Sequence, residues 1–287
     1  MEEAAPMRLG VTMFTTDRAM APHELAAAAE ERGFASCYVP EHTHIPVART
    51  TPAPTGQETL PEEYRRTLDP FVSLAAAAAV TSRITLGTGI CLLAQREPIV
   101  TAKAIATLDQ ISRGRFVFGI GYGWNVEEAA DHDVPWRRRR EVVREKVLAM
   151  RELWSREEAS FRGEFVCFEP SWAWPKPERV PIMLGGAAGS TLFSHVAEFG
   201  DGWMPIGGRG MRQALPRLAQ ACESRGRDPA SVTVMPIGTE PTPEKLDYYA
   251  ALSCQGLGVQ EVVLRLPSAP RDEVLPMLDT YAKTYLP

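Results

Sequence analysis

The sequence has few cysteines, no excess of positive charge and no long apolar run, and each absence excludes a class of protein. It contains five cysteines in 287 residues, an odd number, and no C-x-x-C or C-x-x-H spacing occurs. A disulfide framework is therefore not expected, and we expect a reducing, cytoplasmic compartment. The formal net charge is −5 at pH 7, which sets up no field that would attract nucleic acid.

We expect neither a signal peptide nor a membrane-spanning segment in this sequence. The stretch MEEAAPMRLG is acidic and lacks the basic start and apolar core of a signal peptide. We expect residues 1–6 to form a disordered tail. The alanine-rich run LAAAAAV at 74–80 is far too short to span a bilayer, so no membrane partner is expected.

Apolar β-type runs alternate with helical patterns along almost the whole chain. Eight runs read as strands: 8–14, 35–40, 83–90, 115–121, 180–186, 201–206, 231–238 and 260–266. They are apolar on both faces, as fully buried parallel strands are. Eight parallel strands, each followed by a helix, close into a (β/α)8 TIM barrel of the α/β class. No composition shift marks a second domain, so one domain over residues 1–287 is expected.

Several helices carry recognisable local signals. Asp69 is a good N-cap before Pro70, and Ser190 is the expected cap of a later helix. Over residues 138–154, four apolar residues recur at i, i+4, i+7 and i+11, which predicts an amphipathic helix. These residues are Val143, Val147, Met150 and Trp154.

Two insertions interrupt the alternation. Residues 43–68 are polar and rich in proline and threonine, and they follow the second strand. A loop of this length at the carboxyl ends of barrel strands is usually functional, often a lid. Residues 155–180 predict a small hairpin, and we expect its aromatic residues Phe168, Trp172 and Trp174 to cover the barrel mouth.

The glycine-rich stretch FGIGYGWNVEE at 118–128 is a candidate for a loop that binds phosphate. A dinucleotide fingerprint needs G-x-G-x-x-G at the start of a helix. Here Gly119, Gly121 and Gly123 are followed by Trp124 in the third glycine position, and a tryptophan there would block close helix–strand packing. A Rossmann site is therefore excluded, and a tight turn at the end of a strand remains the alternative.

The stretch GGAAGST at 185–191 is a better phosphate candidate. Small residues let backbone N–H groups approach an anion, Ser190 or Thr191 can add a hydroxyl, and a helix begins there. TIM barrels often hold phosphate on loops after late strands. A plain turn between strand and helix is the alternative.

Two further motifs each allow two interpretations. The glycines of GTGIC at 87–91 indicate either a bulge that a ligand approaches or glycines required by barrel packing. In WRRRRE at 136–141, Arg137 and Glu141 form an i, i+4 pair on a solvated helix face. Attraction of an anionic cofactor tail is the alternative role of this arginine run.

His42 and His44 in the stretch EHTH form an H-x-H pair after the second strand. Alternation would place both imidazoles on one side, as at the start of a metal-dependent hydrolase site. Such a site needs further ligands at later strand ends, where this chain has Gly185 and Gly186 instead. We therefore expect no metal, and we expect His42 to act as an acid, a base or a hydrogen-bond donor at the barrel mouth.

Taken in order, these motifs resemble the luciferase-like monooxygenase superfamily, and most closely its branch that uses the deazaflavin coenzyme F420. The resemblance runs from LGVTMF to at least GDGWMP. It is carried by DPFVSLAAAAAVTSRITLGTGICLL, PIVTAKAIATLDQISRGRFVFGIGYGWNVEE, FRGEF, PIMLGG and FGDGWMP.

The resemblance implies a flavin or deazaflavin across the barrel mouth. It implies a non-prolyl cis peptide between Gly89 and Ile90 that backs the ring, and a catalytic histidine at His42. It implies further that two loops contact the cofactor, one after strand four and one after strand five. These are Gly121, Tyr122, Gly123, Trp124 and Asn125, and Gly185, Gly186, Ala187 and Ala188. A homodimer and a small-molecule substrate are expected from the family.

At one position the sequence departs from the pattern of this family, and three functional hypotheses are compared. Trp124 stands where the sugar-phosphate dehydrogenases of this branch carry a glutamate, and the nearest carboxylates are Glu127 and Glu128. The first hypothesis is an oxidoreductase that transfers hydride between F420 and an organic substrate. The alternatives are an FMN-dependent monooxygenase of the same fold and a cofactor-binding protein without turnover, which the missing carboxylate motivates.

Overall fold

A computed structural model describes residues 7–54, 59–253 and 257–286 of the chain. The predicted tail at 1–6 lies outside the described residues. Nine strands form one sheet in the order β10-β11-β1-β2-β3-β4-β7-β8-β9, and every pair in it is parallel. The strands are β1 (Arg8–Thr12), β2 (Ser36–Val39), β3 (Thr85–Thr88), β4 (Phe116–Ile120), β7 (Ile182–Gly185), β8 (Gly202–Met204), β9 (Thr233–Val234), β10 (Ile237–Thr239) and β11 (Glu261–Arg265).

The sheet closes on itself through β9 and β10, which together make the predicted seventh strand. β9 pairs with β8, while β10 pairs with β11. Pro236 lies between them and has no N–H to donate, but its carbonyl accepts from Val263 N at 2.9 Å. The predicted barrel of eight parallel strand positions is therefore confirmed, with one position split by a proline.

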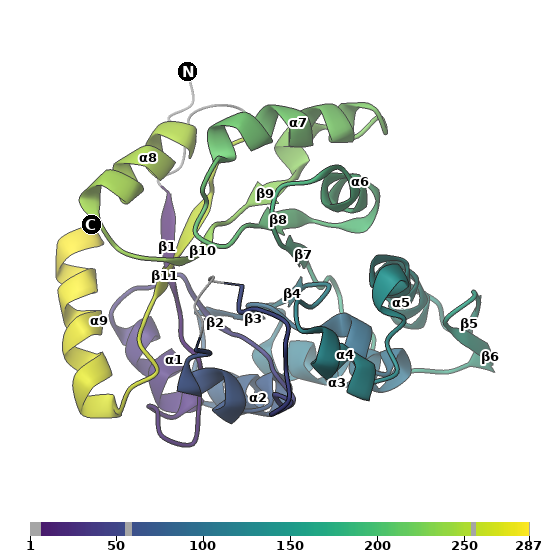
Figure 1. Ribbon diagram of the computed structural model, residues 1–287, viewed down its shortest axis with the longest axis horizontal. Helices are drawn as coiled ribbons and strands as arrows, with labels where there is room; N and C mark the ends of the chain where they lie inside the picture. Colours follow the sequence, from purple (N-terminus) through teal and green to yellow (C-terminus); the bar gives the residue numbers. More distant parts are fainter. Residues whose placement is uncertain (1–6, 55–58, 254–256, 287) are drawn as a thin grey trace.

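A ring of helices surrounds the barrel (Figure 1). The helices that follow the barrel strands are α1 (Pro22–Glu31), α2 (Pro70–Val80), α3 (Pro98–Ser112), α5 (Arg139–Ser155), α6 (Ser190–Phe199), α7 (Met211–Glu223), α8 (Pro243–Ser253) and α9 (Arg271–Tyr285). A short additional helix, α4 (Val126–Asp131), lies between β4 and α5. The 3-10 turns are η1 (Glu62–Arg66), η2 (Leu93–Gln95), η3 (Trp136–Arg138) and η4 (Pro229–Ser231).

The local helix signals are mostly confirmed. The Asp69 side chain accepts from the backbone N–H groups of Phe71 and Val72 and so caps α2. The apolar face of α5 is buried as the periodicity predicts, and the half-buried Trp154 donates its indole N–H to the Ala102 carbonyl at 3.1 Å. The prediction for α6 was wrong by one residue, because Gly189 is the N-cap and Ser190 is the first helical residue.

Side chains fill the barrel interior. A cluster of buried residues from different strands packs against Ile90 and Val117: Tyr38, Met183, Met204, Met235, Ile237 and Val263. The barrel is therefore a packed core, and ligand chemistry belongs to its carboxyl-terminal face. No helix in the described ranges is long and apolar enough to cross a membrane.

The predicted hairpin is present, but it does not cover the barrel mouth. β5 (Ala159–Arg162) and β6 (Cys167–Ser171) pair antiparallel and project at the outer edge of the molecule (Figure 1). Trp172 and Trp174 remain 75% and 58% exposed. Lys103 Nζ bonds the Trp174 carbonyl, which fastens the segment to α3. The reason is topological: α5 runs away from the mouth, so the segment that follows it starts at the other end of the barrel.

Candidate functional site

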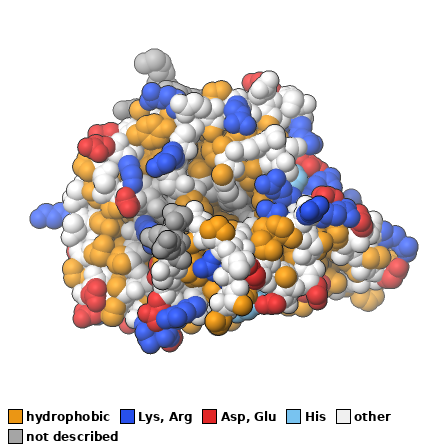
Figure 2. Space-filling model, viewed as in Figure 1, with side chains coloured by type: hydrophobic (Ala, Val, Ile, Leu, Met, Phe, Trp, Pro, Cys, Tyr) orange, Lys and Arg blue, Asp and Glu red, His pale blue; other side chains and the backbone are white. Residues whose placement is uncertain are grey.

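The predicted site segments meet at the carboxyl ends of four neighbouring strands. His42 follows β2, Gly89–Ile90 follows β3, residues 121–125 follow β4 and residues 185–188 follow β7. Because parallel strands end at the same edge, residues as far apart in sequence as His42 and Ala188 come together on one face. The surface of this face is hollowed near its centre (Figure 2).

The peptide bond between Gly89 and Ile90 is cis, as the resemblance predicts. The Ile90 side chain then lies over two other site glycines. A Cβ at Gly121 would lie 1.9 Å from Ile90 Cδ1, and a Cβ at Gly185 would lie 2.7 Å from Ile90 Cγ2. These two glycines therefore make room for Ile90. Gly89 is also a packing glycine, since a Cβ there would lie 2.4 Å from Ile237 Cδ1.

His42 is buried between a carboxylate and an indole. Its Nδ1–H donates to Glu128 Oε2 at 2.8 Å, and its Nε2 accepts the Trp124 indole N–H at 3.3 Å. Both hydrogen bonds fit a neutral imidazole that carries its proton on Nδ1. The carboxylate fixes the tautomer, and Nε2 keeps its lone pair on the side of Trp124.

Glu128 was not among the predicted site residues, although a local signal was present. Asn125 caps α4 through a 3.3 Å hydrogen bond from Glu128 N to its Oδ1, so Glu128 holds the third helical position of an N-x-x-E capping pattern. Its carboxylate instead accepts from His42 and, at 3.2 Å, from Thr43 N. The bond joins residues 86 positions apart, which no local pattern reveals.

A second carboxylate missed by the sequence reasoning supports the cis bulge. Glu41 is buried and accepts from Leu92 N at 2.7 Å and from Arg96 Nε at 2.6 Å. The Glu41 carboxylate helps raise the pKa of the Arg96 guanidinium, against the opposing effect of burial. Glu41 therefore connects the end of β2 with the segment that follows Ile90.

The insertion at 43–68 supplies an aromatic side to the site. Tyr64, in η1, lies 5.2 Å from the His42 ring and 6.1 Å from the Trp124 ring, measured between centroids. The Arg49 guanidinium lies 5.6 Å from the Trp124 centroid. Burial raises the pKa of Tyr64. The half-buried Trp124 therefore contacts the insertion on one side through Tyr64 and Arg49.

Glu127 fastens the first part of this insertion to α4. Its carboxylate accepts from Thr50 N, Thr50 Oγ1, Thr51 N and Thr51 Oγ1 at 2.6–3.1 Å. Those hydrogen bonds, led by the Thr51 hydroxyl, lower the pKa of Glu127 to about 2. A lid motion of residues 43–68 stays a prediction, and residues 55–58 of the insertion lie outside the described residues.

The H-x-H pair does not form a shared ligand site. His44 is exposed and bonds Asp131 Oδ2 through Nε2 at 2.9 Å, whereas the buried His42 bonds Glu128. Both imidazoles face α4, but each has its own carboxylate. Within the described ranges, no group of three or more His, Cys, Asp or Glu residues is arranged to hold a metal ion.

The loop after β7 presents its backbone at the start of α6. Gly186 has φ +141°, Ala187 and Ala188 are exposed, and α6 begins at Ser190. Beside it, the Tyr122 hydroxyl and His195 Nδ1 are 2.7 Å apart. Burial raises the pKa of Tyr122 and lowers that of His195. The exposed backbone at a helix N-terminus suits an anion.

The arginine run at 136–141 pairs differently from the prediction. Glu141 pairs with Arg138 at 2.7 Å, not with Arg137, and Arg138 also pairs with Glu164. Arg138 precedes α5 and acts as its N-cap residue, so helical i, i+4 spacing does not apply there. Arg140 faces the site, with its guanidinium 5.6 Å from the Tyr122 ring centroid.

Comparison with known proteins identifies related chains over most of this length. The family model described as luciferase-like monooxygenase matches residues 7–240. The uncharacterized protein Rv0953c of Mycobacterium tuberculosis is 43% identical over 281 residues, which cover 96% of this chain and 98% of that protein. The F420-dependent glucose-6-phosphate dehydrogenase of Kineococcus radiotolerans is 31% identical over 77% of this chain and 64% of that enzyme.

A solved structure shows the same fold. The monooxygenase RslO1 from Streptomyces bottropensis has a TM-score of 0.74 and 21% sequence identity, with 98% of this chain and 99% of that chain covered.

Proposed function

The chain belongs to the luciferase-like monooxygenase family, and on this premise we propose that it is an oxidoreductase that transfers hydride between coenzyme F420 and a small organic substrate. The observation that carries the proposal is the buried Glu128–His42 pair, whose Nε2 lies beside Trp124 at the barrel mouth. The similarity to an F420-dependent dehydrogenase supports the choice of cofactor.

The residues at the mouth fit a tricyclic ring with a phosphate-bearing side chain. Ile90, on the cis bulge, would lie behind the ring, and residues 121–125 would border it. Asn125 Nδ2 is a buried donor with no hydrogen-bond partner among the described residues, so it suits a polar ring atom or ribityl hydroxyl. The backbone at 185–188 would hold the phosphate at the start of α6.

When bound, the deazaflavin supplies the hydride chemistry. The protein's own contribution is placement and proton transfer. His42 Nε2 would accept the proton from a substrate hydroxyl, or return it to a carbonyl in the reverse direction. Glu128 would keep the imidazole in the Nδ1–H tautomer and stabilise its charged form once Nε2 is protonated. The hydrogen bond from the Trp124 indole N–H to His42 Nε2 would break when the substrate hydroxyl binds to Nε2.

Two alternatives remain within the same family. An FMN-dependent monooxygenase is favoured by the family description, and the likeness to RslO1 adds only that the fold is shared. A cofactor-binding protein without turnover is motivated by Trp124 in place of a carboxylate. Glu128 weighs against it, because a carboxylate still reaches the imidazole from the next helix.

Fluorescence titration of the purified protein with F420 and with FMN tests the proposal. We expect submicromolar binding of F420 and at least about 10-fold weaker binding of FMN, a difference of about 1.4 kcal/mol. Submicromolar binding of FMN with no binding of F420 would identify the monooxygenase alternative. Tight F420 binding without hydride transfer in a broad substrate screen would identify a cofactor-binding protein without turnover.

We propose a homodimer as the working form. The α2 sequence PFVSLAAAAAV has no charged residue, yet Val72 is 73% and Val80 53% exposed. Next to it on α3, Val100 is 68% exposed. A helix that is apolar all round is normally buried, and a second copy would bury this face. Sedimentation of the intact protein tests the dimer, and a monomer at micromolar concentration would contradict it.

We also propose a cytoplasmic location, because the four described cysteines are unpaired: Cys37, Cys91, Cys167 and Cys222. Cys254 lies outside the described residues.

A further inference from the structure

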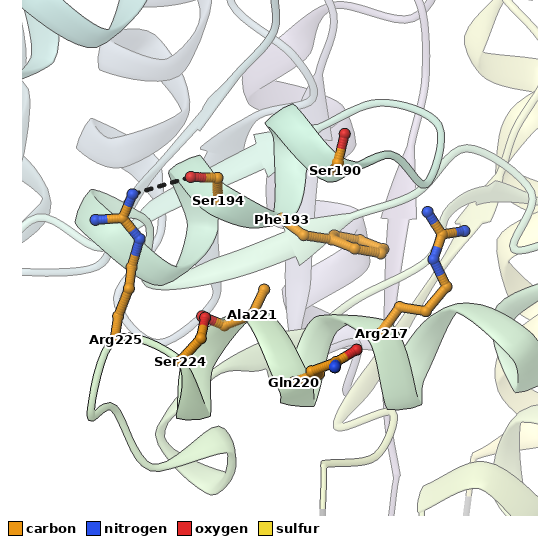
Figure 3. Close-up of a pocket in the computed structure, with 8 residues that line it drawn as sticks. All are labelled: Ser190, Phe193, Ser194, Arg217, Gln220, Ala221, Ser224 and Arg225. Carbon is orange, nitrogen blue, oxygen red and sulfur yellow. Dashed lines mark hydrogen bonds between the residues drawn. The ribbon is translucent and has the colours of Figure 1, made fainter.

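A polar groove lies between α6 and α7 on the outside of the barrel (Figure 3). Its cavity has a volume of about 330 Å³. Phe193 and Ala221 are apolar lining residues, while the other side chains are hydroxyls, an amide and two guanidinium groups. The polar lining residues are Ser190, Ser194, Arg217, Gln220, Ser224 and Arg225.

Helical spacing places these side chains on facing surfaces. On α7, Arg217 and Gln220 are at i and i+3, and Ser224, the C-cap residue, follows at i+7. On α6, Ser190 and Ser194 are at i and i+4. Seven residues of helix span about 10 Å, so the groove is long enough for an extended chain with more than one charged group. Arg217 and Arg225 lie at opposite ends of the drawn set (Figure 3).

The charges of the groove are incompletely neutralised. Arg217 forms no ion pair with any residue in the described ranges, and its contact is with the Phe193 ring, 5.8 Å from the centroid. Arg225 donates to Ser194 Oγ at 3.0 Å and lies 3.9 Å from Glu198 Oε2. Glu198 is already paired with Arg144. Both guanidinium groups therefore have donors left for an anion.

The surrounding sequence is basic in an otherwise acidic protein. The segment RGMRQALPRLAQACESRGR at 209–227 contains five arginines and one glutamate, in a chain with a net charge of −5. A local positive field in an acidic protein favours anionic ligands at that place. The arginine forks match carboxylates in geometry.

One end of the groove adjoins the proposed phosphate loop, because Ser190 begins α6 directly after residues 185–189. We propose that the α6–α7 groove binds the glutamate tail of the deazaflavin cofactor, with Arg217 and Arg225 pairing to its carboxylates. This proposal rests on the proposed function, and it adds a reason for cofactor choice, since FMN ends at its phosphate and has no chain to fill the groove.

The test compares dissociation constants for F420 with several glutamates and for the same cofactor without its glutamates. We expect the tail to tighten binding by about 10-fold or more at low salt, on the scale of charge-assisted pairs. The gain should shrink as the ionic strength is raised, because exposed charges are screened. Equal affinity for F420 with and without its glutamates would overturn the proposal for the groove, while the proposed function would stand.

Arginine variants test whether the groove causes the gain in affinity from the tail. Arg217→Ala with Arg225→Ala is expected to abolish the gain from the tail and to leave binding of the tail-free cofactor within about twofold, a free-energy change well below the 1.4 kcal/mol of a tenfold effect. Arg212→Ala is the matched control, since Arg212 lies on the same helix but faces Tyr248. Both arginines of the groove are exposed, so the fold should persist, and circular dichroism checks this.

A gain that survives the double variant, or that Arg212→Ala removes equally, would overturn the assignment to this groove. Failure of even the tail-free cofactor to bind would instead overturn the proposed function, and the groove proposal with it.

Discussion

Replacing His42 by alanine is expected to lower turnover by about 10²-fold or more, the usual scale for a general acid or base, while cofactor affinity stays within about twofold. The imidazole is buried between Glu128 and Trp124 and presents Nε2 as the atom that can exchange a proton. Of the loops proposed to hold the cofactor, only residues 121–125 contact His42, through the single hydrogen bond from the Trp124 indole N–H. Steady-state kinetics and cofactor titration separate the two effects.

The matched control is His44→Ala. His44 belongs to the same H-x-H motif and also bonds a carboxylate of α4, but it is exposed and pairs with Asp131. Its removal should leave turnover within about threefold, below the range of a general acid or base. Unchanged turnover in His42→Ala, or an equal loss in both variants, would show that His42 is not the proton-transfer group.

The second large effect is expected for Glu128→Gln, which should lower turnover by about 10²-fold or more with little change in cofactor affinity. A carboxamide can present its N–H to Nδ1, which moves the imidazole proton to Nε2 and removes the lone pair that accepts the substrate proton. Nitrogen NMR of the labelled imidazole should report this change of tautomer, which a merely structural role would not produce.

Glu128→Gln should also affect stability. Its carboxylate is buried and accepts from both His42 and Thr43 N. Once the imidazole proton lies on Nε2, the Trp124 indole N–H loses its acceptor. A polar group left without a partner in a largely buried site costs about 1–3 kcal/mol, so a lower free energy of unfolding is expected in denaturant titration. Asp131→Asn is the matched control, because the Asp131–His44 pair is exposed and exposed pairs contribute at most about 1 kcal/mol. Retained turnover and an unchanged tautomer in Glu128→Gln would contradict the positioning role.

The helix caps show how much of the local structure can be predicted from the sequence. Asp69 caps α2 because its side chain reaches N–H groups two and three residues away, and this relation is visible in any short window. Ser190 was assigned one residue away from the true cap, since Gly189 beside it offered no side-chain signal. Helix ends depend on the path of the chain entering the helix as well as on residue type.

The glycines show where local reasoning gives an incomplete reason for a residue. Gly121 and Gly185 were predicted as points of cofactor contact, yet a Cβ at either position would collide with Ile90. Ile90 comes from another strand, so its place between the two glycines follows from barrel closure. The same holds for the hairpin aromatics, because where Trp172 lies depends on the direction of α5 and not on its own neighbours.

The sequence by itself determined the barrel and the order of its strands, because both are written in local periodicity. Its motifs determined the family, and the resemblance to that family indicated the position of the cis bond. The tertiary structure alone decided that Glu128 holds His42, that Ile90 fills the space at two glycines, and that α6 and α7 leave a basic groove between them. Those contacts join residues tens of positions apart, and their partners are chosen by how the backbone closes into a barrel.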